Sequence, residues 1–219
     1  MGVSDDILAV ARGRLLAEAE AVRALTTSID DTFVTAAALV LHCRGKLFIG
    51  GSGTSGTVAR RMAHILSVTG TPAVPFSPMD SLHGSSGAIL PADLVLLISN
   101  GGATTEVLEC ARIVQARGAS VIALTRDHAT PLARLADHSV VVAVDPAAEL
   151  GRVVATGITI AQSAWGDALA EVVMRGRGYT WREFMTTHPA GAVGRLEDLP
   201  PELPALTIPD VDPAQGDRR

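Results

Sequence analysis

The chain has 219 residues, a formal net charge of −5 and a mean hydropathy of +0.31, and hydrophobic residues make up 47% of it. Such a chain can bury a substantial core, in one domain or two. Its 18 Lys and Arg residues are scattered and form no basic stripe, which argues against binding of nucleic acid.

The sequence is not predicted to be that of a membrane protein or of a secreted protein. No apolar run reaches the roughly 18 residues of a membrane span, and the residues after Met1 are polar and acidic, unlike a signal peptide. Cys43 and Cys110 lie far apart, each in an apolar helical context without metal-ligand spacing, and are predicted to be core thiols. We therefore expect a cytoplasmic protein with no metal and no cofactor.

The spacing of apolar residues predicts helices that alternate with short strands. Residues 5–28 carry one apolar helical face, which favours a packing role, within the chain or across a subunit interface. Residues 31–43 are predicted to form a second, nearly all-apolar helix. The predicted elements that follow are strand 46–50, helix 55–68, strands 73–76 and 93–98, helix 105–117, strand 120–125, helix 130–136, strand 138–144 and helix 153–177.

The predicted strands are near-continuous apolar runs, which is typical of a parallel sheet covered by helices on both faces. No linker interrupts the pattern. We predict a single α/β domain over residues 1–198, a three-layer α/β/α sandwich with a mostly parallel, flavodoxin-like sheet of five strands. Residues 199–219, with Pro, Asp and Gly and few large apolar side chains, are predicted to be a mobile C-terminal tail.

Two loops carry the strongest functional signal. Gly50–Gly56 and Ser99–Glu106 each follow an apolar strand, are rich in glycine and hydroxyl side chains, and lead into a helix. Glycine lets the backbone approach a ligand closely, and a helix N-terminus offers unpaired N–H groups to an anion. We predict that both loops bind one small anionic ligand. The candidate binding residues are Ser52, Thr54, Ser55, Ser99, Asn100, Thr104 and Thr105.

Other interpretations of these loops are weaker. A dinucleotide-binding fold has an acidic residue about twenty positions beyond its glycine-rich turn, and the segment 67–76 contains none. A nucleotide P-loop is excluded because no Gly-Lys-Ser/Thr occurs. Some of the hydroxyl side chains could simply cap the helices, a role that is compatible with ligand binding.

Several motifs together resemble the sugar isomerase (SIS) domain, and more narrowly the arabinose-5-phosphate isomerases. Besides the two loops, they are the turn Ser67–Pro72, the motif Leu82-His83-Gly84 and the ending Thr187–Leu196. The similarity covers residues 5–198, and the ending is its most specific part. A pair of regulatory CBS modules usually follows in that family, and this sequence ends before them. The resemblance implies a homo-oligomer, usually a tetramer, with active sites at subunit interfaces.

The resemblance also implies a chemistry and the residues for it. The family interconverts an aldose phosphate and a ketose phosphate through an enediol, which requires a base beside the carbonyl and groups that move hydroxyl protons. Glu106 falls on a family active-site glutamate, and His83 and His188 fall on the two family histidines. From the residues alone, Glu106 could instead stabilise the helix dipole at a helix start, and His188 could do so at a helix end.

This sequence departs from the family pattern at three places. Thr54 stands where the first loop usually has a lysine, and Gly101 and Ala103 stand where the second loop usually has a serine and a glutamate. Ala147 stands where a further glutamate is usual, although Glu149 is nearby. The missing cation could come from Arg60 or Arg61, on the helix after the first loop.

Three functions remain open from the sequence. The first is an aldose–ketose isomerase acting on a sugar phosphate other than arabinose 5-phosphate, with Glu106 as the base assisted by His83 and His188. The second is a sugar-phosphate sensor without catalysis, which would explain the lost residues. The third is an isomerase or lyase of an unphosphorylated sugar or sugar acid.

Overall fold

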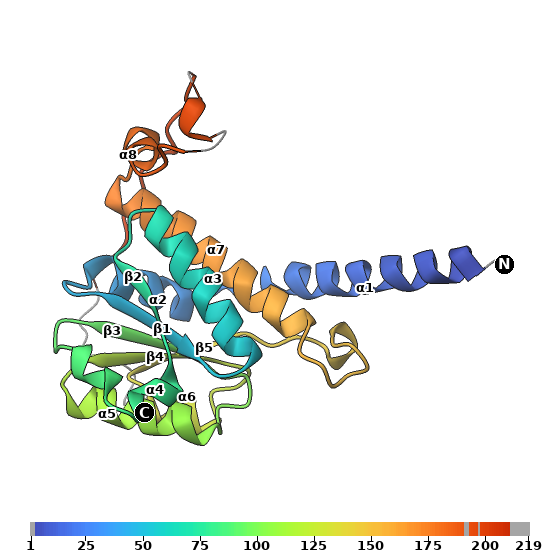
Figure 1. The fold of residues 1–219 in the computed structure, drawn as a ribbon, viewed down its shortest axis with the longest axis horizontal. Coiled ribbons are helices and arrows are strands. Elements are labelled where there is room, and N and C mark those ends of the chain that lie inside the picture. The colour runs from blue at the N-terminus through green and yellow to red at the C-terminus, as the bar shows by residue number, and fades with distance from the viewer. Residues whose placement is uncertain (1–2, 191–192, 197, 211–219) are drawn as a thin grey trace.

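The computed structural model describes residues 3–190, 193–196 and 198–210. Its centre is a sheet of five parallel strands in the order β2-β1-β3-β4-β5 (Figure 1). The strands are β1 (Leu47–Gly51), β2 (Ala73–Phe76), β3 (Leu94–Ile98), β4 (Ser120–Thr125) and β5 (His138–Val141).

Helices cover both faces of this sheet. Alternate residues of a strand face opposite sides, so Leu96 packs with the helices of one face and Leu97 with those of the other. Both are fully buried, which explains why the central strand β3 is apolar at every position. The predicted three-layer α/β sandwich is confirmed. One face carries α2 (Asp31–His42), α3 (Thr54–Val68) and α7 (Gly157–Arg177), and the other carries α4 (Pro78–Ser81), α5 (Thr105–Ala116) and α6 (Pro131–Leu135).

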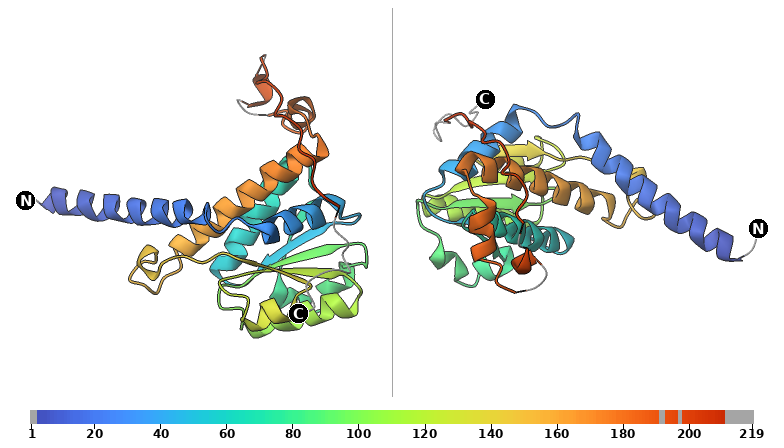
Figure 2. Two further views of the ribbon diagram at one scale, coloured as in Figure 1. Left: turned by 180° about the vertical axis from the view of Figure 1, so that it is seen from behind. Right: turned by 90° about the horizontal axis from the view of Figure 1, so that it is seen from above.

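The first helix, α1 (Val3–Leu25), extends far beyond the sandwich (Figures 1 and 2). Its last turns contact α7, and only Ala21 and Leu25 are buried. The apolar side chains nearer its start, among them Val10 and Leu16, are exposed. The chain therefore leaves a long apolar helical surface uncovered, and the predicted packing across a subunit interface stays a prediction.

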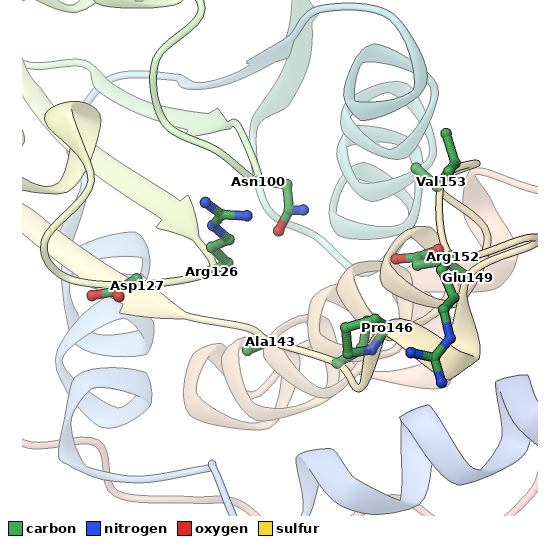
Figure 3. Close-up of a pocket in the computed structure, with 10 residues that line it drawn as sticks. Asn100, Arg126, Asp127, Ala143, Pro146, Glu149, Arg152 and Val153 are labelled. Atoms are coloured by element: carbon green, nitrogen blue, oxygen red, sulfur yellow. The ribbon is translucent and has the colours of Figure 1, made fainter.

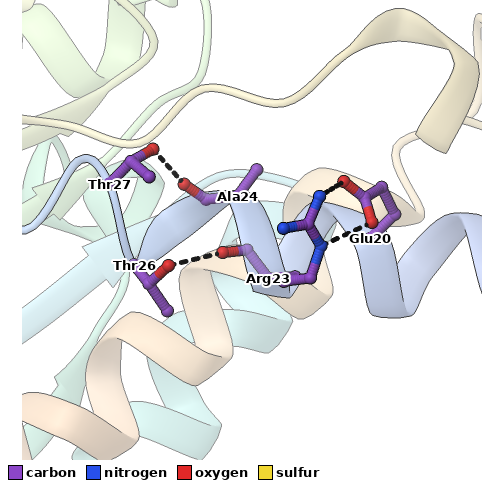
Figure 4. A network of polar contacts seen from close by, with 5 residues as sticks. All are labelled: Glu20, Arg23, Ala24, Thr26 and Thr27. Carbon is purple, nitrogen blue, oxygen red and sulfur yellow. Dashed lines mark hydrogen bonds and ion pairs between the residues drawn. The ribbon is translucent and has the colours of Figure 1, made fainter.

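Helix α1 ends three residues earlier than residue 28, where the sequence predicts its end. The hydroxyl groups of Thr26 and Thr27 donate to the carbonyl oxygens of Arg23 and Ala24, each over 2.8 Å (Figure 4). The last carbonyls of a helix have no partner within the helix. These hydroxyls supply one, which ends the helix at Leu25.

The last long helix, α7, begins at Gly157 rather than at residue 153. Gly151 and Arg152 both have a positive φ, which turns the chain sharply before the helix. The Glu149 carboxylate then accepts hydrogen bonds from the backbone N–H groups of Thr156 (2.6 Å) and Ile158 (3.2 Å). A carboxylate in this position stabilises a helix N-terminus, so it fixes where α7 starts.

Residues 198–210 lie along the far end of α7, after α8 (Trp181–Thr186). Arg175 Nε donates to the carbonyl oxygen of Pro204 (2.8 Å), and Trp181 Nε1 donates to that of Pro201 (3.1 Å). Residues 211–219 of the predicted tail lie outside the described residues. Among the described residues, no helix is long and apolar enough to cross a membrane.

Candidate active site

The sheet topology brings the two predicted loops together. Strands β1 and β3 are neighbours, with Gly51 opposite Ile98 at their carboxyl ends. From β1 the chain continues through α3 to β2, and it then crosses to β3 on the other side of β1. Helices α3 and α5 consequently start from adjacent strand ends and cover opposite faces (Figure 1). In open α/β sheets, ligands bind at such a switch point.

The first loop is built for close approach of its backbone to the next helix. A Cβ atom on Gly56 would lie 2.8 Å from the carbonyl oxygen of Gly51, so only glycine fits. Ser52 and Thr54 are exposed and Ser55 is half-buried. The N-cap residue of α3 is Gly53, which has no side chain with which to cap the helix. The N–H group of Gly56 donates to the carbonyl oxygen of Gly53 (3.0 Å), and those of Thr54 and Ser55 remain available to a ligand.

The second loop is held by the chain after β4. Gly102 has a φ of +61°, and a Cβ atom there would lie 2.5 Å from the Cβ of Thr130. Ser99 is buried, and its Oγ lies 3.4 Å from Oγ1 of Thr104. Thr104 occupies the N-cap position of α5 but makes no capping hydrogen bond, and the neighbouring Thr105 is exposed. The interpretation that these hydroxyls only cap helices is therefore wrong for Thr104.

The predicted catalytic Glu106 is the second residue of α5, directly beyond this loop, and is half-buried. Within the described part of the chain, no hydrogen bond or ion pair engages its carboxylate. His83 is exposed in the turn between α4 and the short helix η1 (Ser85–Ala88). Because α4 packs against α5, His83 lies on the same face of the sheet as Glu106.

His188 lies at the opposite end of the molecule. Helices α3 and α7 run in parallel, since Arg61 bonds to Asp167 and Gly70 contacts Tyr179. His188 follows Tyr179 beyond the end of α7, whereas the first loop lies at the start of α3. The 15 residues of α3 span about 22 Å. Figure 1 shows α8 (Trp181–Thr186), which His188 closely follows, and α5, which carries Glu106, at opposite ends of the molecule. One copy of the chain therefore does not bring His188 to Glu106.

The His188 ring itself is held in place. Its Nδ1 lies 2.8 Å from the carbonyl oxygen of Phe184, and the ring stacks on that of Phe184 with centroids 3.9 Å apart. A carbonyl oxygen only accepts, so Nδ1 is the protonated nitrogen in this bond. The Nε2 atom is then the acceptor of the neutral ring. Gly191 and Ala192, in the same sequence motif, lie outside the described residues.

The two candidate arginines of α3 differ in their contacts. The two terminal guanidinium nitrogens of Arg61 donate to the carboxylate of Asp167 (2.7 and 2.9 Å), and this hydrogen bonding raises the pKa of Arg61. Arg61 is thus directed to α7. Arg60 instead lines a cavity of about 250 Å³ between the first loop and the end of β2, together with Gly51 and Ser77.

Glu149 does not replace the family glutamate in this structure. Its carboxylate is engaged by the start of α7, and the guanidinium of Arg14, on α1, donates to the carbonyl oxygens of Ala148 and Glu149. Ala147 is exposed in the short helix η2 (Pro146–Ala148). The position where the family carries a second carboxylate is therefore apolar here.

A cavity that the sequence reasoning missed opens beside the second loop (Figure 3). It measures about 380 Å³, and we call it the Arg126 cavity. The signal in the sequence is a single arginine directly after an apolar strand, which is too weak to predict a site. The lining residues include Asn100, Arg126, Asp127, Pro146, Glu149 and Arg152.

Among the described residues, no group of three or more His, Cys, Asp and Glu side chains is placed to hold a metal ion. The chemistry available at the strand ends in the described part of the chain consists of hydroxyl groups, backbone N–H groups, carboxylates and arginines. Such donors suit a small phosphorylated molecule.

Comparisons with known proteins agree with the resemblance predicted from the motifs. A model of the SIS domain matches residues 40–172. Arabinose 5-phosphate isomerase GutQ of Salmonella typhi is 34% identical over 192 residues, which are 88% of this chain and 60% of that protein. Arabinose 5-phosphate isomerase KdsD of Pseudomonas aeruginosa is 35% identical over 178 residues, 81% of this chain and 55% of that protein. This chain spans little more than half the length of these relatives.

Among solved structures, the protein c3406 of Escherichia coli CFT073, in complex with arabinose 5-phosphate, superposes with a TM-score of 0.82. The two proteins are 28% identical, and the match covers 86% of this chain and 100% of that one. The predicted fold and family resemblance are therefore both confirmed.

Proposed function

This chain belongs to the SIS domain family, and on that premise we propose that it is a sugar-phosphate isomerase that interconverts an aldose and a ketose. The observation that carries the proposal is the pair of hydroxyl-rich loops at the switch point, with Glu106 directly beyond the second loop. The substrate phosphate would be bound by the free N–H groups of α3 and α5 and by the hydroxyls of Ser52, Thr54, Ser55, Ser99, Thr104 and Thr105, with Asn100 beside them.

In the proposed mechanism, the Glu106 carboxylate removes the proton from the carbon next to the carbonyl. The electron pair of that C–H bond forms the enediol, and the proton returns to the neighbouring carbon to complete the isomerisation. The hydroxyl proton moves between the two oxygens of the enediol, and Nε2 of His188 is suited to accept and return it. His83 assists, for example in opening a cyclic sugar.

We further propose that the active site is shared between copies of the chain. The distance from the first loop to His188 within one copy supports this, and so does the exposed apolar face of α1, which a second copy would cover. A tetramer is the expected assembly. We expect it to be cytoplasmic, with one domain over residues 1–198 followed by the tail 199–219.

The test is a panel of pentose, hexose and tetrose phosphates, with the matching sugar acids and free sugars, added to the purified full-length protein. Binding is measured by thermal shift, and conversion by NMR. A ligand at a hundred times its Kd adds about 2.7 kcal/mol to the stability of the folded state, which is readily detected. We expect at least one sugar phosphate to bind and to be converted. Conversion of unphosphorylated sugars alone would contradict the proposed phosphate site.

A second candidate function, a sensor that binds without catalysis, is favoured by the exposed Ala147 and by Thr54 in place of the usual lysine. In the same panel, a sensor would be stabilised by a sugar phosphate that it never converts. Conversion of any member of the panel would eliminate this candidate.

The hydroxyls of the loops can be tested one at a time. We expect Ser99→Ala and Ser55→Ala each to weaken sugar-phosphate binding by about 1–2 kcal/mol, the contribution of one lost hydrogen bond. Isothermal titration calorimetry measures the change. Ser67→Ala is the control, because Ser67 bonds to the carbonyl oxygen of Ala73 near the far end of α3. Unchanged affinity in both loop variants would show that these hydroxyls do not contact the phosphate.

A further inference from the structure

The Arg126 cavity adjoins the second loop on the side away from the first loop. The strand order β1-β3-β4-β5 puts the first loop at β1, the second at β3, and the cavity across the ends of β3, β4 and β5. Its volume of about 380 Å³ is within the range of small-molecule sites. Asn100 belongs both to the second loop and to the cavity lining, so a ligand on the loop can reach into it.

The acidic side chains that line the cavity already have partners. Asp127 Oδ1 accepts the backbone N–H of Ala129 over 2.8 Å, and its side chain points away from that of Arg126 (Figure 3). The Glu149 carboxylate accepts two N–H groups from the start of α7. Neither carboxylate forms an ion pair with Arg126 in the described residues, so the Arg126 guanidinium is available to a ligand.

Arg126 and Asn100 face each other in the cavity. The backbone N–H of Arg126 donates to the carbonyl oxygen of Asn100 over 3.1 Å, which ties the two residues together. The Arg126 guanidinium is exposed and extends toward the Asn100 amide, while that of Arg152 points elsewhere (Figure 3). Oδ1 of Asn100 is buried and has no hydrogen-bond partner among residues 3–190, 193–196 and 198–210. A buried acceptor without a donor is costly, and a bound hydroxyl group would relieve this.

We propose that Arg126 binds the phosphate of the substrate from the second-loop side, and that Asn100 Oδ1 accepts a hydrogen bond from a hydroxyl group close to that phosphate. The inference rests on the proposed function and assigns to Arg126 the cationic role that the usual lysine would have at Thr54. The ligand class is a polyol phosphate with a hydroxyl beside the phosphate-bearing carbon. A guanidinium suits this role, because it donates two parallel hydrogen bonds to a phosphate.

Arg126 is a stronger candidate than Arg60 for this role. The cavity beside Arg60 is lined by glycines of the first loop and by Ser77, whose Oγ is already engaged by the N–H of Asp80. None of the candidate binding residues of the two loops lines it, whereas one of them, Asn100, lines the Arg126 cavity. The Arg126 cavity, in contrast, contains an unsatisfied acceptor beside the cation.

The test compares arginine variants of the full-length protein by calorimetric titration with arabinose 5-phosphate, and with inorganic phosphate as a competitor. We expect Arg126→Gln to raise the Kd for arabinose 5-phosphate about tenfold or more, and Arg126→Lys to recover part of the affinity, since lysine keeps the charge but not the fork. Arg134→Gln is the matched control. It removes the same charge from an exposed arginine of α6 and should change the Kd less than about twofold.

The outcomes separate this inference from the proposed function. If arabinose 5-phosphate binds to wild type but is not converted, the protein is not shown to be an isomerase of that sugar. The Kd values of the Arg126 variants for arabinose 5-phosphate still show whether Arg126 binds the phosphate. An unchanged Kd in Arg126→Gln, or a loss in Arg60→Gln alone, would overturn the inference. It is overturned as well if wild type binds neither arabinose 5-phosphate nor inorganic phosphate. The melting temperature of Arg126→Gln should equal that of wild type, because no hydrogen bond or ion pair of the Arg126 side chain is found in the described residues.

Discussion

Glu106→Gln should lower the turnover of the sugar phosphate by about 10²-fold or more, because it removes the base that takes the proton from carbon. Gln has nearly the same shape as Glu and keeps one of its two acceptor oxygens. We therefore expect the affinity for the sugar phosphate and the melting temperature to stay close to those of wild type. Steady-state kinetics with NMR detection of the product gives the change in kcat separately from that in KM.

Glu109→Gln is the matched control for this variant. Glu109 lies one turn later on α5, is exposed, and pairs with Arg112 at 2.5 Å. An exposed ion pair of this kind contributes little to stability, so the control should turn over normally. If Glu106→Gln also turns over normally, Glu106 serves only the helix dipole, and the base is elsewhere.

Two inactive variants should recover activity when they are produced together. Glu106→Gln and His188→Asn should each be nearly inactive. When the two are co-expressed in equal amounts, about one quarter of the sites would combine an intact Glu106 from one copy with an intact His188 from another, as expected for symmetric assemblies with shared sites. Activity should then rise to about one quarter of that of wild type.

A second mixture checks the arithmetic. Wild type co-expressed in equal amounts with the double variant should also retain about one quarter of the activity if the sites are shared, but about one half if each chain builds its own site. If the first mixture recovers no activity and the second retains about one half of the wild-type activity, Glu106 and His188 act within one copy of the chain. The same purified samples give the oligomeric state by light scattering.

The sheet could be predicted because each of its strands is marked by residues that are neighbours in the sequence. A strand with helices on both faces is apolar at nearly every position, and such runs are visible in the sequence at Leu94–Ile98 and Val121–Leu124. The two loops could be predicted for a similar reason, since each follows a strand of this kind and carries its glycines and hydroxyls within a few residues.

Other features depend on contacts between distant parts of the chain. The start of α7 is set by Glu149, which lies seven and nine positions before the two N–H groups that it accepts. The arrangement of His188 relative to Glu106 depends on the parallel packing of α3 and α7, which no local pattern reveals. The Arg126 cavity depends on three strand ends, those of β3, β4 and β5, that become neighbours only in the folded sheet.

The parallel packing of α3 and α7 also has a consequence for how activity responds to dilution. Each chain carries the strand-end loops at one end of these helices and His188 at the other. If the site is shared, a folded but isolated chain has two half-sites and no complete one. Activity per chain should then fall as the protein is diluted below the Kd of its assembly, while the melting curve of the α/β core changes far less. The concentration of the protein itself would thus act as a control on its catalysis.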